Sequence, residues 1–309
     1  MSPGEGMVVA LPERWDEACF AVPAVRALVR SGLIGALVCS EEQESFWKTV
    51  CALPCFTFSQ KTSTGQLAKL LANDWNASLV WEDGVAAKAF AKAKIPRRLG
   101  PASANLKKLL THPLQAHEAP TEHRVRLYLN TAEEMGVPVD QPEFFAPASL
   151  DIPTKSNSIL LCPGSDFGIS HEWPLDRWQM VAEALLEKGK RLTIAGSIGS
   201  RDLGKILVGR LGGEAEFFHA APFNAALPSL ATFQRVIAAD GSLPHLAAYA
   251  GSTCVTLFGP NDPNWKRPLG KQHVIVKHHV ECSPCMSPKC LMDERCQNEL
   301  QVADVLGFC

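Results

Sequence analysis

The sequence lacks the features that would place it in a membrane, on nucleic acid or in a secretory pathway. It has no run approaching the roughly 18 consecutive apolar residues of a membrane-spanning helix. Its formal net charge is −2, whereas proteins that hold nucleic acid through its phosphates are normally basic. The opening stretch, MSPGEGMVVALPERWDE, has neither the basic nor the apolar segment of a signal peptide. We therefore expect a cytoplasmic protein that binds no nucleic acid.

Cysteine is not scarce, but its use argues against a disulfide framework. In the cytoplasm the eleven cysteines are expected to be reduced thiols, and seven of them are scattered like small core residues. The other four, Cys282, Cys285, Cys290 and Cys296, are separated by two, four and five residues. This spacing is compatible with tetrahedral zinc, or with a zinc knuckle that binds RNA. A purely structural role without metal is the alternative.

The length and composition predict two globular α/β domains. The chain has 309 residues, 46% of them apolar, and fits two domains of about 150 residues each. In the first half, MVVALP and IGALVCS read as buried strands on either side of a helix in VPAVRALVRSG, with Pro23 in its first turn. ASLVWED predicts a further strand, VAAKAFAKA and EHRVRLYLNTAEEMG predict helices, and PRRLGPASANLKKLLTH reads as irregular. A strand, a helix and a second strand form a βαβ unit, which implies a parallel sheet.

The second half repeats this pattern after a proline-rich segment. Four prolines between residues 138 and 153 mark an interdomain linker, so we expect domains at residues 1–150 and 151–309. SILLCPG, RLTIAGS, FQRVIAAD and TCVTLFGP predict strands, while PLDRWQMVAEALLEKG and PHLAAYAG predict helices.

The segment ADGSLPHLAAYAGS, residues 239–252, is the main candidate for a ligand site. Asp240 follows a predicted parallel strand, where open α/β sheets bind ligands. The first turn of the next helix has free N–H groups that suit a phosphate, Gly241 and Ser242 allow close approach, and His245 can donate to it. These residues therefore predict a diphosphate cradle, with Asp240 fixing the loop or holding a sugar hydroxyl. The structural alternative is a helix cap at Asp240 and a core histidine at His245.

A longer stretch, ADGSLPHLAAYAGSTCVTLFGPNDPNWKRP, resembles the signature of family 9 glycosyltransferases, the bacterial ADP-heptose:lipopolysaccharide heptosyltransferases. CPGSDFGISHEWPLDRWQMVAEALLEKGKRLTIAGS, VPAVRAL, IPRRLG and HRVRLYLNTAEEMG resemble other segments of this family, in order, from about Met7 to Val305. The residues that match the signature are Asp240, His245, Leu246, Ala247, Ala248, Phe258, Gly259, Pro260, Asp262 and Pro263.

This resemblance implies the GT-B architecture, in which two Rossmann-like domains with parallel sheets face a central cleft. Residues 1–150 would bind a lipid-linked glycan acceptor, and residues 151–309 would bind a nucleotide-diphosphate sugar such as ADP-heptose. The protein would then work in peripheral contact with the inner membrane. No cofactor is required for such chemistry. A Cys-Ser-Pro-Cys run is frequent in this family without a metal in the reaction, so we favour a structural role for the four clustered cysteines.

The resemblance also assigns roles to individual residues. The family's catalytic base lies six residues before a proline, which gives Glu17 here, with Asp16 as the second candidate; both are expected in a loop. Their structural alternative is a pair of first-turn acids that favour the helix dipole. Ser165, His171 and Ser197 would join Asp240, Gly241, Ser242 and His245 in binding the donor.

Several departures from the family pattern keep other functions open. The family's base is an Asp preceded by Gly, where this chain has Glu17 preceded by Asp16. His171 stands where the family has a lysine near the phosphates, and Gly241 and Ser242 stand where it has Ser or Thr and then Gly. The alternative is therefore a nucleotide-sugar-binding protein of the same fold with impaired catalysis. A sugar-nucleotide epimerase shares the fold, but its acidic and histidine pattern is not evident here. An NAD enzyme is disfavoured because no G-x-G-x-x-G follows the first strand.

Overall fold

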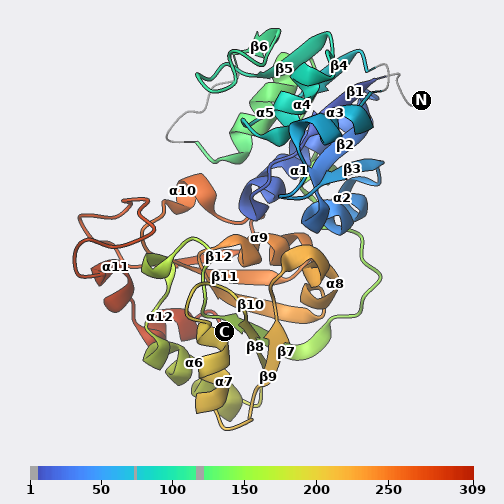
Figure 1. Ribbon diagram of the computed structural model, residues 1–309. Helices are drawn as coiled ribbons and strands as arrows, with labels where there is room; N and C mark the ends of the chain where they lie inside the picture. Colours follow the sequence, from blue (N-terminus) through green and yellow to red (C-terminus); the bar gives the residue numbers. More distant parts are fainter. Residues whose placement is uncertain (1–5, 73–74, 116–121) are drawn as a thin grey trace. The chain divides into compact units, whose positions relative to one another are not determined.

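The computed structural model describes residues 6–72, 75–115 and 122–309 (Figure 1). The chain divides into two compact units, of which unit 1 ends at Ala146 and unit 2 begins at Pro147. This division falls inside the proline-rich segment. No helix among the described residues combines the length and apolar character needed to cross a membrane.

Unit 1 is built on a six-stranded parallel sheet in the order β3-β2-β1-β4-β5-β6. The expected strands at both ends of the first βαβ unit and in ASLVWED are confirmed. The strands are β1 (Met7–Ala10), β2 (Ile34–Ser40), β3 (Cys55–Phe58), β4 (Ala77–Leu79), β5 (Arg97–Pro101) and β6 (His112–Leu114).

Helices cover both faces of this sheet. One face packs against α3 and α4 through a core that includes Val8, Val38, Leu67 and Phe90. The other face carries α1, which contacts α5 and α2. The helices are α1 (Trp15–Arg30), α2 (Glu44–Cys51), α3 (Thr64–Leu70), α4 (Val85–Lys92) and α5 (Val125–Glu134), with short 3₁₀ turns η1 (Glu41–Gln43) and η2 (Pro142–Phe145).

Helix α1 begins much earlier than the sequence pattern predicts. It starts at Trp15, so Pro23 lies inside the helix and the acids Asp16 and Glu17 lie in its first turn, not in a loop. Acidic residues in a first turn are favoured by the helix dipole. Burial of the whole segment from Asp16 to Val25 supplies apolar packing that outweighs the helix-breaking tendency of Pro23.

The stretch PRRLGPASANLKKLLTH is not irregular throughout. It contains β5, whose Leu99, Gly100 and Pro101 are buried between neighbouring strands. The two arginines at the start of β5 obscure this strand in the sequence. Arg98 is a structural residue, because its guanidinium donates to the carbonyl oxygens of Leu109 and Ile95 at 2.7 Å each.

Unit 2 has the same plan. Its parallel strands lie in the order β12-β11-β10-β7-β8-β9, and the four strands predicted in this half are confirmed. They are β7 (Lys155–Cys162), β8 (Arg191–Gly196), β9 (Glu216–His219), β10 (Phe233–Ala239), β11 (Thr253–Phe258) and β12 (Val274–Lys277).

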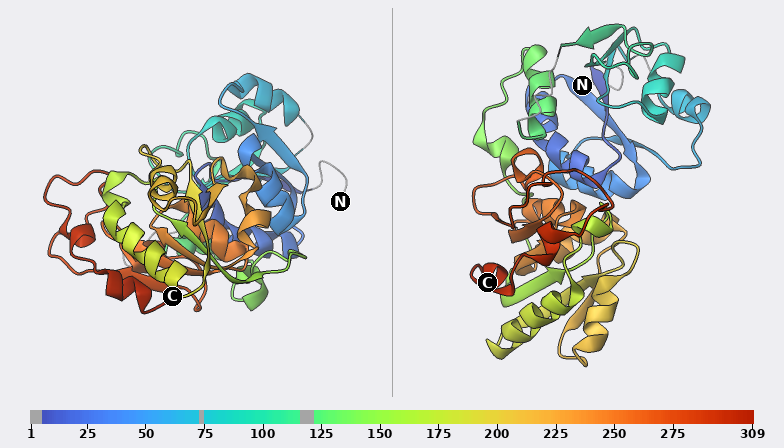
Figure 2. Two further views of the ribbon diagram at one scale, coloured as in Figure 1. Left: turned by 90° about the horizontal axis from the view of Figure 1, so that it is seen from below. Right: turned by 90° about the vertical axis from the view of Figure 1, so that its left-hand side faces the viewer.

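The helices of unit 2 also form two layers. The helices α6 (Leu175–Glu187), α7 (Leu203–Arg210) and α12 (Val302–Leu306) share one core with alternate residues of the strands, and Figures 1 and 2 show α6 and α7 side by side. The helices α8 (Ala226–Leu230) and α9 (Ser242–Tyr249) pack together, and α9 contacts β10 and β11. The remaining turns are η3 (Ile169–His171), η4 (Phe223–Ala225), α10 (Pro263–Lys266) and α11 (Arg295–Asn298).

Candidate active site

Each sheet has a point where the strand order reverses, between β1 and β4 in unit 1 and between β7 and β10 in unit 2. Loops that leave neighbouring strands at such a point run in opposite directions and open a crevice at the carboxyl edge of the sheet. The predicted site residues follow these strands. Asp16 and Glu17 come after β1, Ser165 comes after β7, and Asp240 comes after β10.

In unit 2 the two loops at the reversal point are joined directly. The hydroxyl of Ser165 donates to the carbonyl oxygen of Asp240 at 2.6 Å, and both residues are buried. Gly164 precedes Ser165, and a Cβ on it would lie 2.5 Å from the carbonyl oxygen of Ile198. Only glycine fits there, so the loop after β8, which begins with Ser197, is held against the loop after β7.

The carboxylate of Asp240 is the centre of a buried polar network. Its Oδ2 lies 3.1 Å from Nδ1 of His171 and accepts a hydrogen bond from Nδ2 of Asn261 at 2.6 Å. Burial raises the pKa of the Asp240 carboxyl above its ordinary 3.8, and the contacts with His171 and Asn261 oppose that rise. Within the described part of the chain its second oxygen, Oδ1, is buried and has no hydrogen-bond partner. That atom can accept a hydrogen bond from a ligand.

The first turn of α9 is engaged by an acidic side chain. The backbone N–H of Ser242 donates to Oδ1 of Asp166 at 2.8 Å, and its hydroxyl donates to Oδ2 at 2.6 Å. A Cβ on Gly241 would lie 2.8 Å from the same carboxylate, so glycine leaves room for it. The sequence pattern predicts open amides here and gives no sign of Asp166. Asp166 is itself exposed, which leaves its carboxylate accessible to solvent.

Two further predicted donor residues, His245 and Ser197, follow β10 and β8, the strands on either side of β7, at the same edge of the sheet. His245 is buried within α9. Ser197, just after β8, has a left-handed backbone with φ of 64°, and its N–H donates to Asp202 at 2.8 Å. The Ser197 hydroxyl lies 3.3 Å from Nδ1 of His219.

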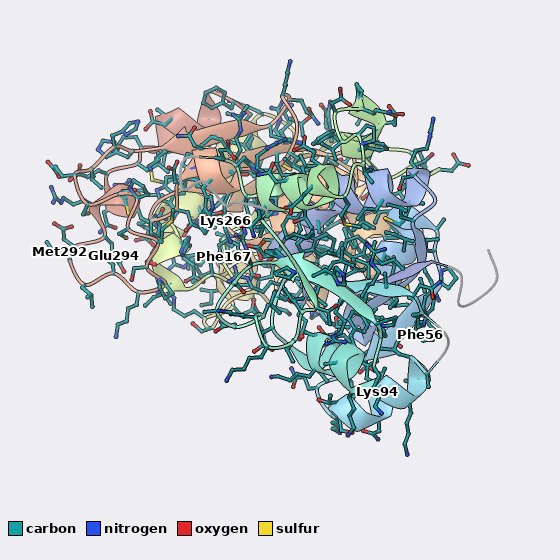
Figure 3. All side chains as sticks on the ribbon, turned by 90° about the horizontal axis from the view of Figure 1, so that it is seen from above. Phe56, Lys94, Phe167, Lys266, Met292 and Glu294 are labelled. Atoms are coloured by element: carbon teal, nitrogen blue, oxygen red, sulfur yellow. The ribbon has the colours of Figure 1, made fainter. Side chains whose placement is uncertain are left out.

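Lys266 is a charged residue near this network that the sequence pattern did not single out. It ends α10, is only 5% exposed, and its Nζ lies 5.4 Å from the ring centroid of Phe167 and 4.8 Å from that of Trp265. Figure 3 shows Lys266 and Phe167 close together. Its position in FGPNDPNWKRP was the available signal, because that stretch follows the strand next to Asp240.

In unit 1 the carboxylate of Glu17 is held by Arg124, the residue just before α5, and by Tyr128 within α5. Nε of Arg124 donates to its two oxygens at 3.0 and 2.8 Å, and the hydroxyl of Tyr128 donates to Oε2 at 2.6 Å. Burial raises the pKa of the Tyr128 hydroxyl well above its ordinary value, and the negative charge of Glu17 adds to that rise. These bonds tie the first turn of α1 to α5.

Asp16, the neighbouring acid, has a different partner. The guanidinium of Arg14 contacts both of its oxygens at 3.1 Å. The Asp16 side chain is 1% exposed, whereas the Arg14 side chain is 60% exposed. An exposed arginine adds little free energy to such a pair, so this pair is more easily opened than the Glu17 cluster.

A hollow of about 670 Å³ lies at the carboxyl ends of β2 and β3 in unit 1. Phe58 gives it an aromatic wall, and three glutamates stand against a single lysine in its lining. The lining residues are Glu13, Ser40, Glu41, Glu42, Phe58, Ser59, Gln60, Lys61, Thr62 and Val85.

The four clustered cysteines differ in their exposure to solvent. Cys282 and Cys285 are exposed, Cys290 is half-buried and Cys296 is buried. Across residues 6–72, 75–115 and 122–309, no three His, Cys, Asp or Glu side chains are grouped so that they could hold a metal ion.

Comparison with known proteins gives a consistent result. Lipooligosaccharide heptosyltransferase 2 of Haemophilus ducreyi is 29% identical over 129 residues, and lipopolysaccharide heptosyltransferase 2 of Escherichia coli is 24% identical over 121 residues. Each match covers 38% of this chain and only 35% of the relative's length. The solved structure of E. coli ADP-heptose lipopolysaccharide heptosyltransferase II matches 98% of this chain and 97% of its own, with a TM-score of 0.80 and 16% identity.

The structural match confirms the expected fold, an α/β chain of the GT-B type with two parallel sheets. The model of glycosyltransferase family 9 (heptosyltransferase) matches residues 69–295, more than two thirds of the sequence. This chain therefore belongs to glycosyltransferase family 9, the heptosyltransferase family.

Proposed function

We propose that the protein is an inverting glycosyltransferase that moves a heptose, or a related sugar, from an ADP-linked donor to a lipopolysaccharide core or similar glycan. The observation that carries this proposal is the buried network of His171, Asp240 and Asn261 at the strand reversal of unit 2. It lies beside the first turn of α9, where a diphosphate is favoured by backbone N–H groups.

In this proposal unit 2 holds the donor. The free Oδ1 of Asp240 accepts a hydrogen bond from a sugar hydroxyl. Ser242 donates to the diphosphate once the exposed Asp166 carboxylate has moved aside. Ser165, Ser197 and His245 complete the pocket wall. The diphosphate gains negative charge as its bond to the sugar breaks, and donors already in place stabilise that charge.

Unit 1 holds the acceptor and supplies the base. The acceptor hydroxyl attacks the anomeric carbon, its proton passes to a carboxylate, and the bond from that carbon to the diphosphate oxygen breaks. The family spacing favours Glu17 for this role, but both Glu17 oxygens already accept bonds from Arg124 and Tyr128. Asp16 is paired with the exposed Arg14, which an acceptor can displace more easily than the Glu17 partners, so we place the base there.

The hollow at β2 and β3 is the proposed acceptor pocket. Phe58 contributes an apolar edge to the lining, and Ser40, Ser59 and Thr62 offer hydroxyls. Three glutamates against one lysine favour hydroxyl groups over a cluster of phosphates, because like charges in one hollow repel. A lipid-linked acceptor would bring the protein to the cytoplasmic face of the inner membrane.

A second candidate function is nucleotide-sugar binding without transfer. It is favoured by one observation, that both candidate bases in unit 1 are paired with arginines. The two functions differ in turnover and not in donor binding.

The test is transfer from ADP-heptose to heptose-deficient lipopolysaccharide, with ADP release measured alongside. The transferase proposal predicts turnover that Asp16→Asn lowers by about 100-fold or more, in the range of a general base, while Glu133→Gln on the surface of α5 has no effect. Donor binding without ADP release, with any acceptor, would instead support the binding protein.

A further inference from the structure

Lys266 is unusual for a lysine because it is buried. Among the lysines and arginines of residues 6–72, 75–115 and 122–309, Lys266 is the single one whose side chain is buried. Removing an ammonium group from water costs free energy, so lysines are rarely buried unless their charge interacts with another group. The rings of Phe167 and Trp265 border its Nζ at the distances of cation–π contacts.

The lysine belongs to the donor network by position. Phe167 lies in the loop after β7, where its ring packs edge-on against His171 at 5.6 Å between centroids. On the other side, α10 begins two residues after Asn261, the amide that donates to Asp240. The charge of Lys266 is one of the influences that lower the pKa of Asp240 against the effect of burial. Lys266 therefore stands within electrostatic reach of the network.

A pyrophosphate at the mouth of α9 would lie beside two carboxyl groups. Asp166 and Asp240 bring two carboxyl groups to the mouth of α9, and His171 is turned to Asp240 through Nδ1. Arg201 is committed to Glu172, with Nη2 2.6 Å from its Oε2. A pyrophosphate placed here would meet carboxylates unless a positive charge accompanied it.

We infer that Lys266 supplies the positive charge that holds the donor's diphosphate and stabilises it as it leaves. This inference rests on the proposed function, since it names the cation of that same donor site. It also explains how the proposed donor site could bind a negatively charged diphosphate with a histidine, not a lysine, at position 171. His171 then acts as a positioning residue for Asp240, while Lys266 faces the phosphates.

The experiment compares ADP with adenosine by titration calorimetry on the whole chain. Lys266→Met keeps the length of the side chain between the two rings but removes its charge, Lys266→Arg keeps the charge, and Lys271→Met removes an exposed lysine nearby. We expect Lys266→Met to weaken ADP binding by at least about tenfold, the usual effect of losing one charged hydrogen bond. Adenosine binding should be unchanged, and Lys266→Arg and Lys271→Met should bind ADP almost as the parent does.

A second measurement addresses the position of the charge. Adding His171→Lys to Lys266→Met should restore part of the lost ADP affinity, because it returns a cation to the same edge. Equal loss of ADP and adenosine binding in Lys266→Met would overturn the inference and assign Lys266 a structural role. Unchanged ADP binding would overturn it as well. If the parent protein binds no ADP at all, the proposed function itself fails.

Discussion

The carboxylate of Asp166 accepts two hydrogen bonds from Ser242, one from the backbone N–H at 2.8 Å and one from the hydroxyl at 2.6 Å. An anion therefore already sits at the first turn of α9, the position proposed for the diphosphate. A carboxylate and a phosphate oxygen seek the same donors, so Asp166 and the ligand compete for this place. Because Asp166 is exposed, replacing its carboxylate with a phosphate at Ser242 costs little free energy, since the released carboxylate is solvated by water.

The first prediction concerns this competition. Asp166→Asn removes a negative charge beside the diphosphate, so ADP should bind about three- to tenfold more tightly. Adenosine, which has no phosphate, should bind as before in the same calorimetric titrations. Asp176→Asn, at an exposed position on α6, is the matched control. Weaker ADP binding by Asp166→Asn at unchanged stability would mean that Asp166 helps the ligand and does not compete with it.

The second prediction is a pH dependence from Asp240. Its folded pKa is raised, so the unfolded chain loses this proton first as the pH rises above 3.8, and the free energy of unfolding falls. Asp240→Asn cannot ionise, so its stability relative to the parent should increase over the same rise in pH. Urea unfolding at a series of pH values measures this difference. A stability of Asp240→Asn relative to the parent that stays constant, or that falls, as the pH rises contradicts the assignment.

The third prediction concerns the Glu17 cluster. Tyr128→Phe removes one donor from a buried carboxylate and should lower the free energy of unfolding by about 1–3 kcal/mol. Glu17→Gln should make the Tyr128 substitution less harmful, so the double variant should lose less than the sum of the single losses. Strict additivity in this cycle would show that the hydrogen bond contributes nothing measurable.

The fourth prediction tests the acceptor pocket. Replacing Glu41 and Glu42 by alanine removes two hydrogen-bond acceptors from the hollow, so KM for a glycan acceptor should rise several-fold while KM for the donor stays the same. Glu44→Ala, outside the lining, is the control. A change in the donor's KM with no change in the acceptor's would place the acceptor elsewhere.

The sequence predicts the central strands and the long helices because their apolar periodicity is strong. It misses β3, β5, β6, β9 and β12, which are short strands at the edges of the two sheets or next to an edge, where partial exposure breaks the apolar run. The start of α1 is missed for a different reason: packing of the whole first turn decides it, and proline preference points to a later start.

The site is predictable only in part, because neighbours along the chain do not reveal partners across the sheet. The rule that ligands bind beyond parallel strands brings Ser165 and Asp240 to one edge, and they are found hydrogen-bonded there. The cap by Asp166 and the clamp of Arg124 on Glu17 join residues 76 and 107 positions apart. No local pattern encodes such pairs, and Lys266 reads as an ordinary surface lysine until its burial is known.

Titration of the purified protein with ADP, UDP and GDP tests directly whether unit 2 has a nucleotide-sugar site at the mouth of α9. We predict saturable binding of ADP that exceeds binding of the other two, that weakens with rising salt, and that is reduced in Asp240→Asn. Absence of binding to all three nucleotides would contradict a donor site at the mouth of α9, and with it the transferase proposal.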